Sequence, residues 1–137
     1  MEAFKIFDIS ASAMFAQRER MNVLASNMAN AHTTKTETGE PYIRKDVLFT
    51  AIPFPSNPVP LYGVAVYDVV QDSAPFKVIY QPGHPDADKD GFVRYPNVDV
   101  IKEMVNMMMA MRAYEASASA FNISKTMYMK LLELGRV

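Results

Sequence analysis

Residues 97–134, NVDVIKEMVNMMMAMRAYEASASAFNISKTMYMKLLEL, decide the fold, because this stretch contains neither proline nor glycine. Pro96 prevents a regular helix from entering it from upstream, and Asn97 or Asp99 can cap its first turn. Gly135 favours termination just beyond it. The stretch therefore predicts one helix of about 57 Å at 1.5 Å per residue.

The apolar residues of this helix form two rows. The first repeats every seven residues and is typical of a coiled-coil-like seam: Val100, Met107, Tyr114, Phe121 and Tyr128. The second lies beside it: Met104, Met108, Met111, Ala118, Met129 and Leu132. A helix that is apolar on this many sides needs more than one neighbour, so we expect other subunits to cover it.

Proline, glycine and methionine divide the chain. All nine prolines lie in residues 41–96, and all eleven methionines lie outside that interval. We therefore expect an α+β fold in which long N- and C-terminal helices pack as a coiled-coil-like pair around a small β-rich insert. The predicted parts are an N-terminal helix (1–32), a β-rich inserted domain (33–96) and a C-terminal long helix (97–137).

The first helix is predicted to begin near Asp8 or Ser10 and to end around Asn30. A seven-residue repeat marks its inner side: Phe7, Met14, Met21 and Met28, with Leu24 as a companion. At roughly 33 Å it would be much shorter than its partner, leaving part of the long helix without a cover.

Asn27 and Asn30 are the notable polar residues of this first helix. They can cap the helix or set the register of its packing, which is the favoured interpretation. Alternatively, they mark a contact with a partner that requires one alignment.

The insert has strand signals at residues 42–52, 64–70 and 76–80, which are rich in β-branched and aromatic residues. Residues 53–60, PFPSNPVP, are predicted to be an extended surface connector, and a role as a ligand for SH3-type domains is disfavoured. Because so few short strands bury little surface, we expect the insert to lean on one of the helices.

Residues 86–91, DADKDG, match the first half of an EF-hand loop, with Asp86, Asp88 and Asp90 as candidate ligands. The second half fails, because loop position twelve is Asn97 and cannot supply a bidentate carboxylate. The alternatives are a calcium-binding helical interaction module and an Asx-type structural turn, and we favour the turn. Its expected residues are Gly83, Asp86, Asp88, Asp90, Gly91 and Pro96.

Composition disfavours several other functions. Fourteen basic and fifteen acidic residues give a net charge of -1, so no basic field for nucleic acid is present. His32 and His84 have no second ligand nearby in sequence, and the chain has no cysteine. We expect no enzyme, cofactor, metal or small-molecule substrate, no cleaved signal peptide and no membrane span.

Five stretches resemble one known family from end to end. They are residues 9–18 (ISASAMFAQR) with 21–31 (MNVLASNMANA), 39–42 (GEPY), 82–99 (PGHPDADKDGFVRYPNVD), 111–116 (MRAYEA) and 125–136 (KTMYMKLLELGR). Residues 82–99 are the most specific of these. The chain resembles the FlgC family, the proximal-rod proteins of the bacterial flagellar basal body. The Pro-rich connector, His32 and the methionines at 107–109 depart from the family pattern.

The resemblance implies a structural subunit that polymerises through its terminal helices into a hollow, torque-transmitting shaft in the periplasm or cell-wall zone. It implies neighbours that are copies of itself and rod proteins of the FlgB, FlgF, FlgG and FliE types, and passage through the flagellar type III export apparatus. The expected assembly interface comprises Met14, Met21, Leu24, Asn27, Met28, Asn30, Met104, Met107, Met108, Met111, Tyr114, Phe121, Tyr128 and Leu132.

Overall fold

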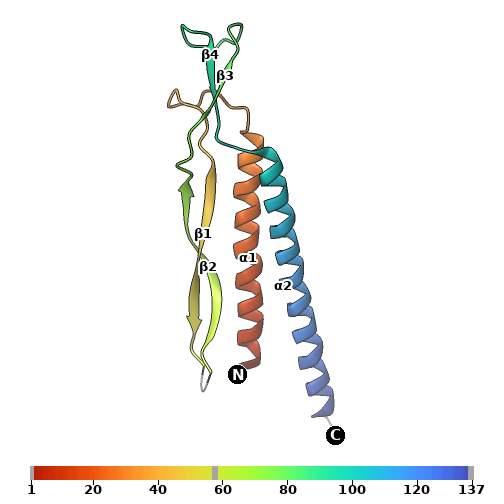
Figure 1. Ribbon diagram of the computed structural model, residues 1–137. Coiled ribbons are helices and arrows are strands. Elements are labelled where there is room, and N and C mark those ends of the chain that lie inside the picture. Colours follow the sequence, from red (N-terminus) through yellow and green to blue (C-terminus); the bar gives the residue numbers. More distant parts are fainter. Residues whose placement is uncertain (1, 57–58, 136–137) are drawn as a thin grey trace.

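The computed structural model describes residues 2–56 and 59–135 and confirms the α+β prediction (Figure 1). Two long helices flank a β region of two small sheets. The elements are, in order, α1 (Glu2–Ala29), β1 (Lys45–Phe54), β2 (Leu61–Gln71), β3 (Lys77–Tyr80), β4 (Phe92–Tyr95) and α2 (Val100–Leu134).

The long helix α2 has clear local start and stop signals. The Asp99 side chain accepts hydrogen bonds from the backbone N–H groups of Ile101 and Lys102, at 3.1 and 3.3 Å. At the other end, the Gly135 N–H donates to the Leu131 carbonyl at 3.1 Å. Of the two caps that the sequence offered, Asp99 is therefore the one used.

The predicted start of α1 near Asp8 or Ser10 is wrong, because α1 begins at Glu2. Tertiary contacts stabilise the extra turns: the Phe7 ring lies 5.0 Å from that of Phe121, and the Phe4 ring lies 5.7 Å from that of Tyr128. With 28 and 35 residues, α1 and α2 are about 42 and 52 Å long. The difference in length between the two helices is therefore smaller than expected. The exposed apolar residues of α2 lie along its whole length, on the sides that do not face α1, and not only where α2 extends past α1.

The β elements occupy two places in the molecule (Figure 1). The antiparallel β1–β2 hairpin runs beside α1, and the antiparallel β3–β4 hairpin lies at the end away from both termini. Ser12 of α1 accepts a 3.1 Å hydrogen bond from the Val64 N–H, and Lys5 donates to the Pro55 carbonyl. The expectation that the insert leans on a helix is thus confirmed.

The strands differ from the prediction in length and number. β1 ends at Phe54 and β2 begins at Leu61, so of the predicted connector only Pro53 and Phe54 lie in a strand, and the described residues 55, 56, 59 and 60 link the two strands. Pro53 pairs with Tyr62 in β1–β2. Proline has no N–H donor, but it is tolerated here because both strands of a two-stranded sheet are edge strands. Asn57 and Pro58 lie outside the described residues. β4 was not predicted from the sequence. It pairs with β3 from Lys77 opposite Tyr95 to Tyr80 opposite Phe92.

Two local features shape the β1–β2 hairpin. Its register shifts between Leu48, which pairs with Asp68, and Phe49, which pairs with Val66, so Tyr67 forms a bulge. Gly63 is buried against α1, and an added Cβ would lie 2.7 Å from Ser12 Oγ. Only glycine lets β2 approach the helix this closely.

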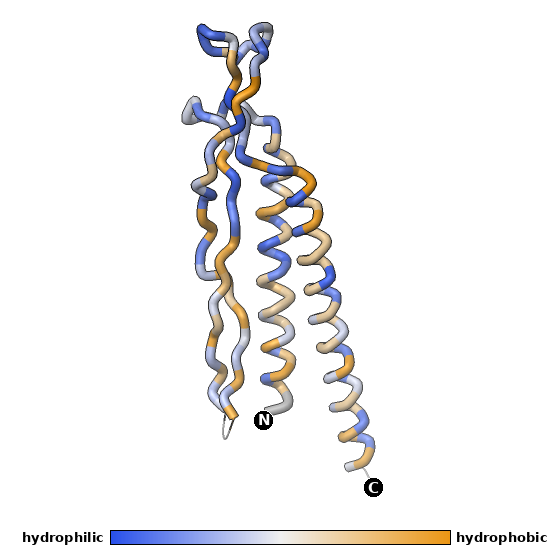
Figure 2. Tube along the Cα trace, in the orientation of Figure 1, coloured by the Kyte–Doolittle hydropathy of each residue, from blue (hydrophilic) through white to orange (hydrophobic). Residues whose placement is uncertain are grey.

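The core is thin and is built mainly from small side chains. Its buried apolar residues are Ala16, Leu24, Ala31, Val47, Val93, Val98 and Ala110. Figure 2 shows apolar segments recurring along both helices and the β1–β2 hairpin, whereas the β3–β4 tip is mostly hydrophilic. Within the described part of the chain, no helix is both long and apolar enough to span a membrane.

Candidate assembly surface and the polar cluster that positions it

A buried polar cluster joins α1 to the start of β1. Asn27 is fully buried, and its amide nitrogen donates to the Lys45 carbonyl at 2.7 Å and to Glu103 Oε2 at 2.8 Å. Its amide oxygen accepts from the Lys45 N–H and from the Tyr42 hydroxyl, both at 3.0 Å. All four hydrogen-bonding positions of this amide are occupied, which is the condition for burying it without penalty.

Glu103 brings α2 into the same cluster. This carboxylate is only 1% exposed and lies on the side of α2 that faces α1. The Arg44 guanidinium donates to Glu103 Oε1 through Nε at 2.7 Å. Burying a charge is costly unless the charge is paired and hydrogen-bonded. Here Oε1 accepts from Arg44 and Oε2 accepts from Asn27, so both carboxylate oxygens have a partner.

Arg44 is surrounded by carboxylates. Its Nη1 lies 3.2 Å from Asp46 Oδ2 and 3.3 Å from Asp72 Oδ2. Burial lowers the pKa of Arg44, but the hydrogen bond and charge of Glu103, together with Asp46, outweigh this effect and raise the pKa above its ordinary value. The guanidinium therefore stays charged and holds β1, the end of β2 and α2 together.

Asn97 completes these connections just before α2. Its side-chain oxygen accepts from the Arg44 N–H at 2.8 Å, and its amide nitrogen donates to the Asp72 and Ala74 carbonyls at 3.2 and 3.0 Å. From the sequence, Asn27 and Asn30 were both expected to cap α1 or to set the register of its packing, and no role in this cluster was predicted for Arg44 or Glu103. One sequence signal could have indicated that Glu103 is buried. It begins a seven-residue repeat with the small residues Ala110, Ser117 and Ser124, which lies on the side of α2 that faces α1.

The expected interface residues fall into three groups by exposure. The buried ones are Leu24 and Asn27; the partly buried ones are Met14, Met21, Met28, Asn30, Met107, Phe121 and Tyr128; the exposed ones are Met104, Met108, Met111, Tyr114 and Leu132. Asn30 bonds locally, donating to the Ser26 carbonyl at 2.9 Å and accepting from Thr33 Oγ1 at 3.2 Å. The first two groups pack largely within this chain, and the third forms a surface that the chain itself leaves open.

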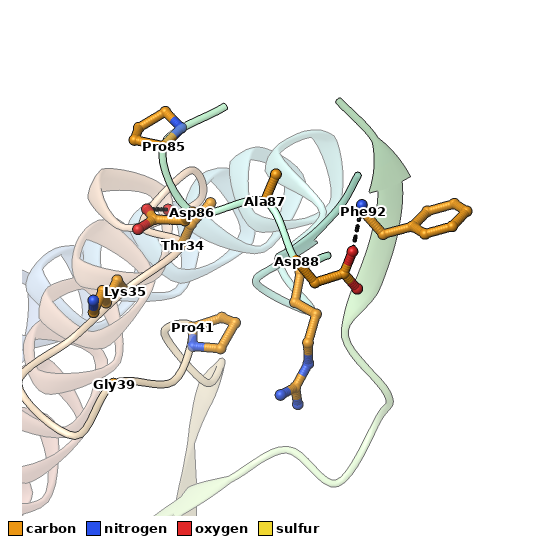
Figure 3. Close-up of a pocket in the computed structure, with 10 residues that line it drawn as sticks. Thr34, Lys35, Gly39, Pro41, Pro85, Asp86, Ala87, Asp88 and Phe92 are labelled. Carbon is orange, nitrogen blue, oxygen red and sulfur yellow. Dashed lines mark hydrogen bonds between the residues drawn. The ribbon is translucent and has the colours of Figure 1, made fainter. Parts of the chain in front are cut away.

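The 86–91 segment is the tip of the β3–β4 hairpin. Asp88 Oδ1 accepts from the backbone N–H of Asp90 at 2.9 Å and from that of Phe92 at 2.8 Å, the second of which is drawn in Figure 3. Gly91 has φ 84° and is buried, and its N–H donates to the Asp88 carbonyl at 3.1 Å. The turn is therefore an Asx-type turn that uses a left-handed glycine.

The other expected turn residues have separate roles. Asp86 accepts a 2.7 Å hydrogen bond from Thr34 and lines a hollow of 340 Å³ together with Lys35 and Asp88 (Figure 3). Gly83 and Asp90 are exposed, and Pro96 is buried beneath the start of α2. Within residues 2–56 and 59–135, no group of three or more acidic, histidine or cysteine side chains could hold a metal ion. The calcium interpretation receives no support from this geometry.

Comparison with known proteins gives two family matches. Residues 7–35 match the family described as flagella basal body rod protein, and residues 89–134 match the family described as flagellar basal body rod FlgEFG protein C-terminal. These matches cover most of α1 and all of α2.

Full-length relatives are also found. The flagellar basal-body rod protein FlgC of Escherichia coli O157:H7 is 46% identical over 136 residues, covering 99% of this chain and 100% of that protein. The FlgC protein of Aquifex aeolicus strain VF5 is 42% identical over 133 residues, covering 97% of each chain. That of Bacillus subtilis strain 168 is 41% identical over 150 residues, covering 99% of this chain and 100% of the relative.

Proposed function

Because this chain belongs to the FlgC family of flagellar basal-body rod proteins, we propose that it assembles with its neighbours through the exposed methionine row of α2. Membership makes it a structural subunit of the flagellar basal-body rod, which assembles with other rod components. Its role is structural and not enzymatic. The methionine row comprises Met104, Met108 and Met111.

The observation that carries the proposal is the exposure of this row. Met104, Met108 and Met111 are 54, 65 and 48% exposed, on a helix whose neighbouring side, which carries Glu103, Ala110 and Phe121, is already packed on α1. Contiguous apolar surface of this kind marks an interaction site, and methionine side chains adapt to partners of different shape.

The buried cluster supports the same proposal indirectly. Asn27, Arg44 and Glu103 set the position of α2 relative to α1 and the hairpin, so the methionine row is presented in one orientation. A subunit that transmits torque needs such rigid joints between its elements. We infer that the partly buried seam keeps the pair of helices together while the row makes contacts between subunits.

The finer assignments follow from the family and are part of the proposal. The neighbours are copies of this chain and rod proteins of the FlgB, FlgF, FlgG and FliE types, delivered by the flagellar type III export apparatus without a cleaved signal. The helical parts (1–32 and 97–137) would form the inner wall of a hollow shaft in the periplasm or cell-wall zone. The inserted part (33–96) would face outward.

A charge in the methionine row tests the proposal. Met108→Asp should abolish swimming and leave no complete rods in isolated basal bodies, because a carboxylate would be buried without a partner. Ala120→Asp is the matched control, since Ala120 is also exposed on α2 but lies about 120° from Met108 around the helix axis. Normal rods in the Met108→Asp strain would refute the proposed surface.

A further inference from the structure

All the sulfur atoms of this chain belong to methionine, because the chain has no cysteine. Among the described methionines, the exposed ones all lie on α2 and are between 48 and 65% exposed: Met104, Met108, Met109, Met111, Met127 and Met129. The described methionines of α1 are partly buried: Met14, Met21 and Met28. Exposed thioethers react with oxidants, and this chain offers no thiol that could react first. The sulfur that an oxidant can reach is therefore concentrated on the helix that carries the methionine row.

Residues 107–109 are three consecutive methionines that lie on three sides of α2, because successive residues of a helix are about 100° apart. Met107 is partly buried, whereas Met108 and Met109 are 65 and 59% exposed. Met108 belongs to the methionine row, and Met109 lies outside it. Adjacent positions thus provide a shielded thioether, an exposed thioether inside the row and an exposed thioether outside it.

A hollow of 200 Å³ gives small molecules access to the methionine row. It is lined by Met108, Met111, Arg112 and Glu115. Its volume is far larger than the roughly 30 Å³ that a water molecule occupies in the liquid, so hydrogen peroxide, which is little larger than water, can enter it. An oxygen atom added to either sulfur also has room there. Oxidation of the row should therefore leave the fold of the free subunit intact.

We propose that the methionine row is a reversible oxidation site, at which a peroxide converts the unassembled subunit into a form that cannot assemble. The inference rests on the proposed function, since it concerns the same row. The peroxide transfers one oxygen to Sδ: an S–O bond forms, the O–O bond breaks, the thioether sulfur is oxidised by two electrons and the peroxide is reduced to water. The sulfoxide is polar, and burial against an apolar neighbour leaves its oxygen without a hydrogen-bond donor. Methionine sulfoxide reductases reverse the change, and assembly shields the row from it.

Hydrogen peroxide treatment of the purified full-length subunit tests the chemistry. Trypsin releases residues 103–112, EMVNMMMAMR, as one peptide, in which tandem mass spectrometry locates each added oxygen. We expect Met108 to be oxidised severalfold faster than Met107, with an unchanged circular dichroism spectrum, and severalfold more slowly in isolated basal bodies than in the free subunit. Oxidation of Met107 as fast as that of Met108 would overturn the inference. Equal oxidation of Met108 in basal bodies and in the free subunit would refute the proposed function as well.

Glutamine substitutions test the consequence for assembly, because glutamine resembles the sulfoxide in being polar, uncharged and of similar length. Met108→Gln should give severalfold fewer complete rods in isolated basal bodies, whereas Met108→Leu and Met109→Gln, the matched controls, should assemble normally. An equal defect in either control would overturn the inference. The Met108→Asp strain separates the two proposals. Normal rods in that strain refute the methionine row and this inference with it, whereas missing rods there combined with normal rods in the Met108→Gln strain refute only the oxidation site.

Discussion

Asn27 of α1 and Glu103 of α2 share a 2.8 Å hydrogen bond between Nδ2 and Oε2, although they are far apart in sequence. Both side chains are almost completely buried, at 0 and 1% exposure. The same carboxylate receives Arg44, which leads into β1. One small cluster thus determines how the two helices and the hairpin meet.

Removing the carboxylate should destabilise the fold strongly. Glu103→Ala leaves the Arg44 charge largely buried and the Asn27 amide one acceptor short, so we expect a loss of about 3 kcal/mol in the free energy of unfolding. Arg44 retains Asp46 and Asp72, which keeps the loss at the low end of the range for such pairs. Chemical denaturation followed by circular dichroism measures it. Glu115→Ala, in an exposed ion pair with Arg112, should change stability little; equal losses in the two variants would contradict a special role for the cluster.

The aromatic contact near the other end of the seam should also be required. Phe121→Asp removes the ring that packs 5.0 Å from Phe7 and places a carboxylate in the seam, where it has no partner. Phe121 is only partly buried, so loss of its ring should cost less than the about 3 to 5 kcal/mol typical of a core phenylalanine, but the unpaired carboxylate adds to this and we expect rod assembly and swimming to fail. Swimming in soft agar is the measurement, and Lys89→Ala, in the exposed hairpin tip, is the control. Equal swimming of both strains would show that the seam is not needed.

The β3–β4 turn should depend on backbone conformation and not on charge. Gly91→Val forces a branched side chain into φ 84°, where its Cβ would also lie 2.9 Å from the Tyr80 ring. We expect a loss of about 1 to 2 kcal/mol from the left-handed conformation alone, with impaired assembly. Gly83→Ala is the control, because an added Cβ there meets no atom within 4 Å.

Asp88→Asn separates the turn from a calcium site. Asparagine still accepts from the Asp90 and Phe92 N–H groups but lacks the ligand charge, so swimming should be unchanged with or without a chelator. A strong defect in this variant, reproduced by calcium depletion of the wild type, would revive the metal interpretation.

Amide exchange of the isolated protein should show a gradient along α2. Glu103 and Ala110 are its only fully buried residues, and both lie in its first third. We expect slow exchange around them and fast exchange beyond residue 115, because the rest of the helix packs on one side only. Mass spectrometry of exchanged peptides tests this. Uniform protection of both helices in a monodisperse monomer would show that the helices are ordered without assembly.

Some local features could be predicted from the sequence, and others depend on tertiary contacts that the sequence does not show. The caps of α2 and the left-handed Gly91 were predictable, because a helix end and a tight turn depend on residues adjacent in the chain. The start of α1 was not, because its first turns depend on the rings of Phe121 and Tyr128. β4 was missed because its four residues follow the acidic turn directly and gain their stability by pairing with β3.

The sequence by itself determined the two helices and the β-rich insert, since heptad spacing and turn residues act over short distances. The five stretches that resemble rod proteins also indicated the family. Only the tertiary structure decided which polar residues are buried together and which apolar residues remain open. Glu103 is charged and inside, whereas Met108 is apolar and outside. The physical reason is that burial depends on the direction in which a helix faces its neighbours, and that direction is set by distant groups such as Asn27 and Arg44.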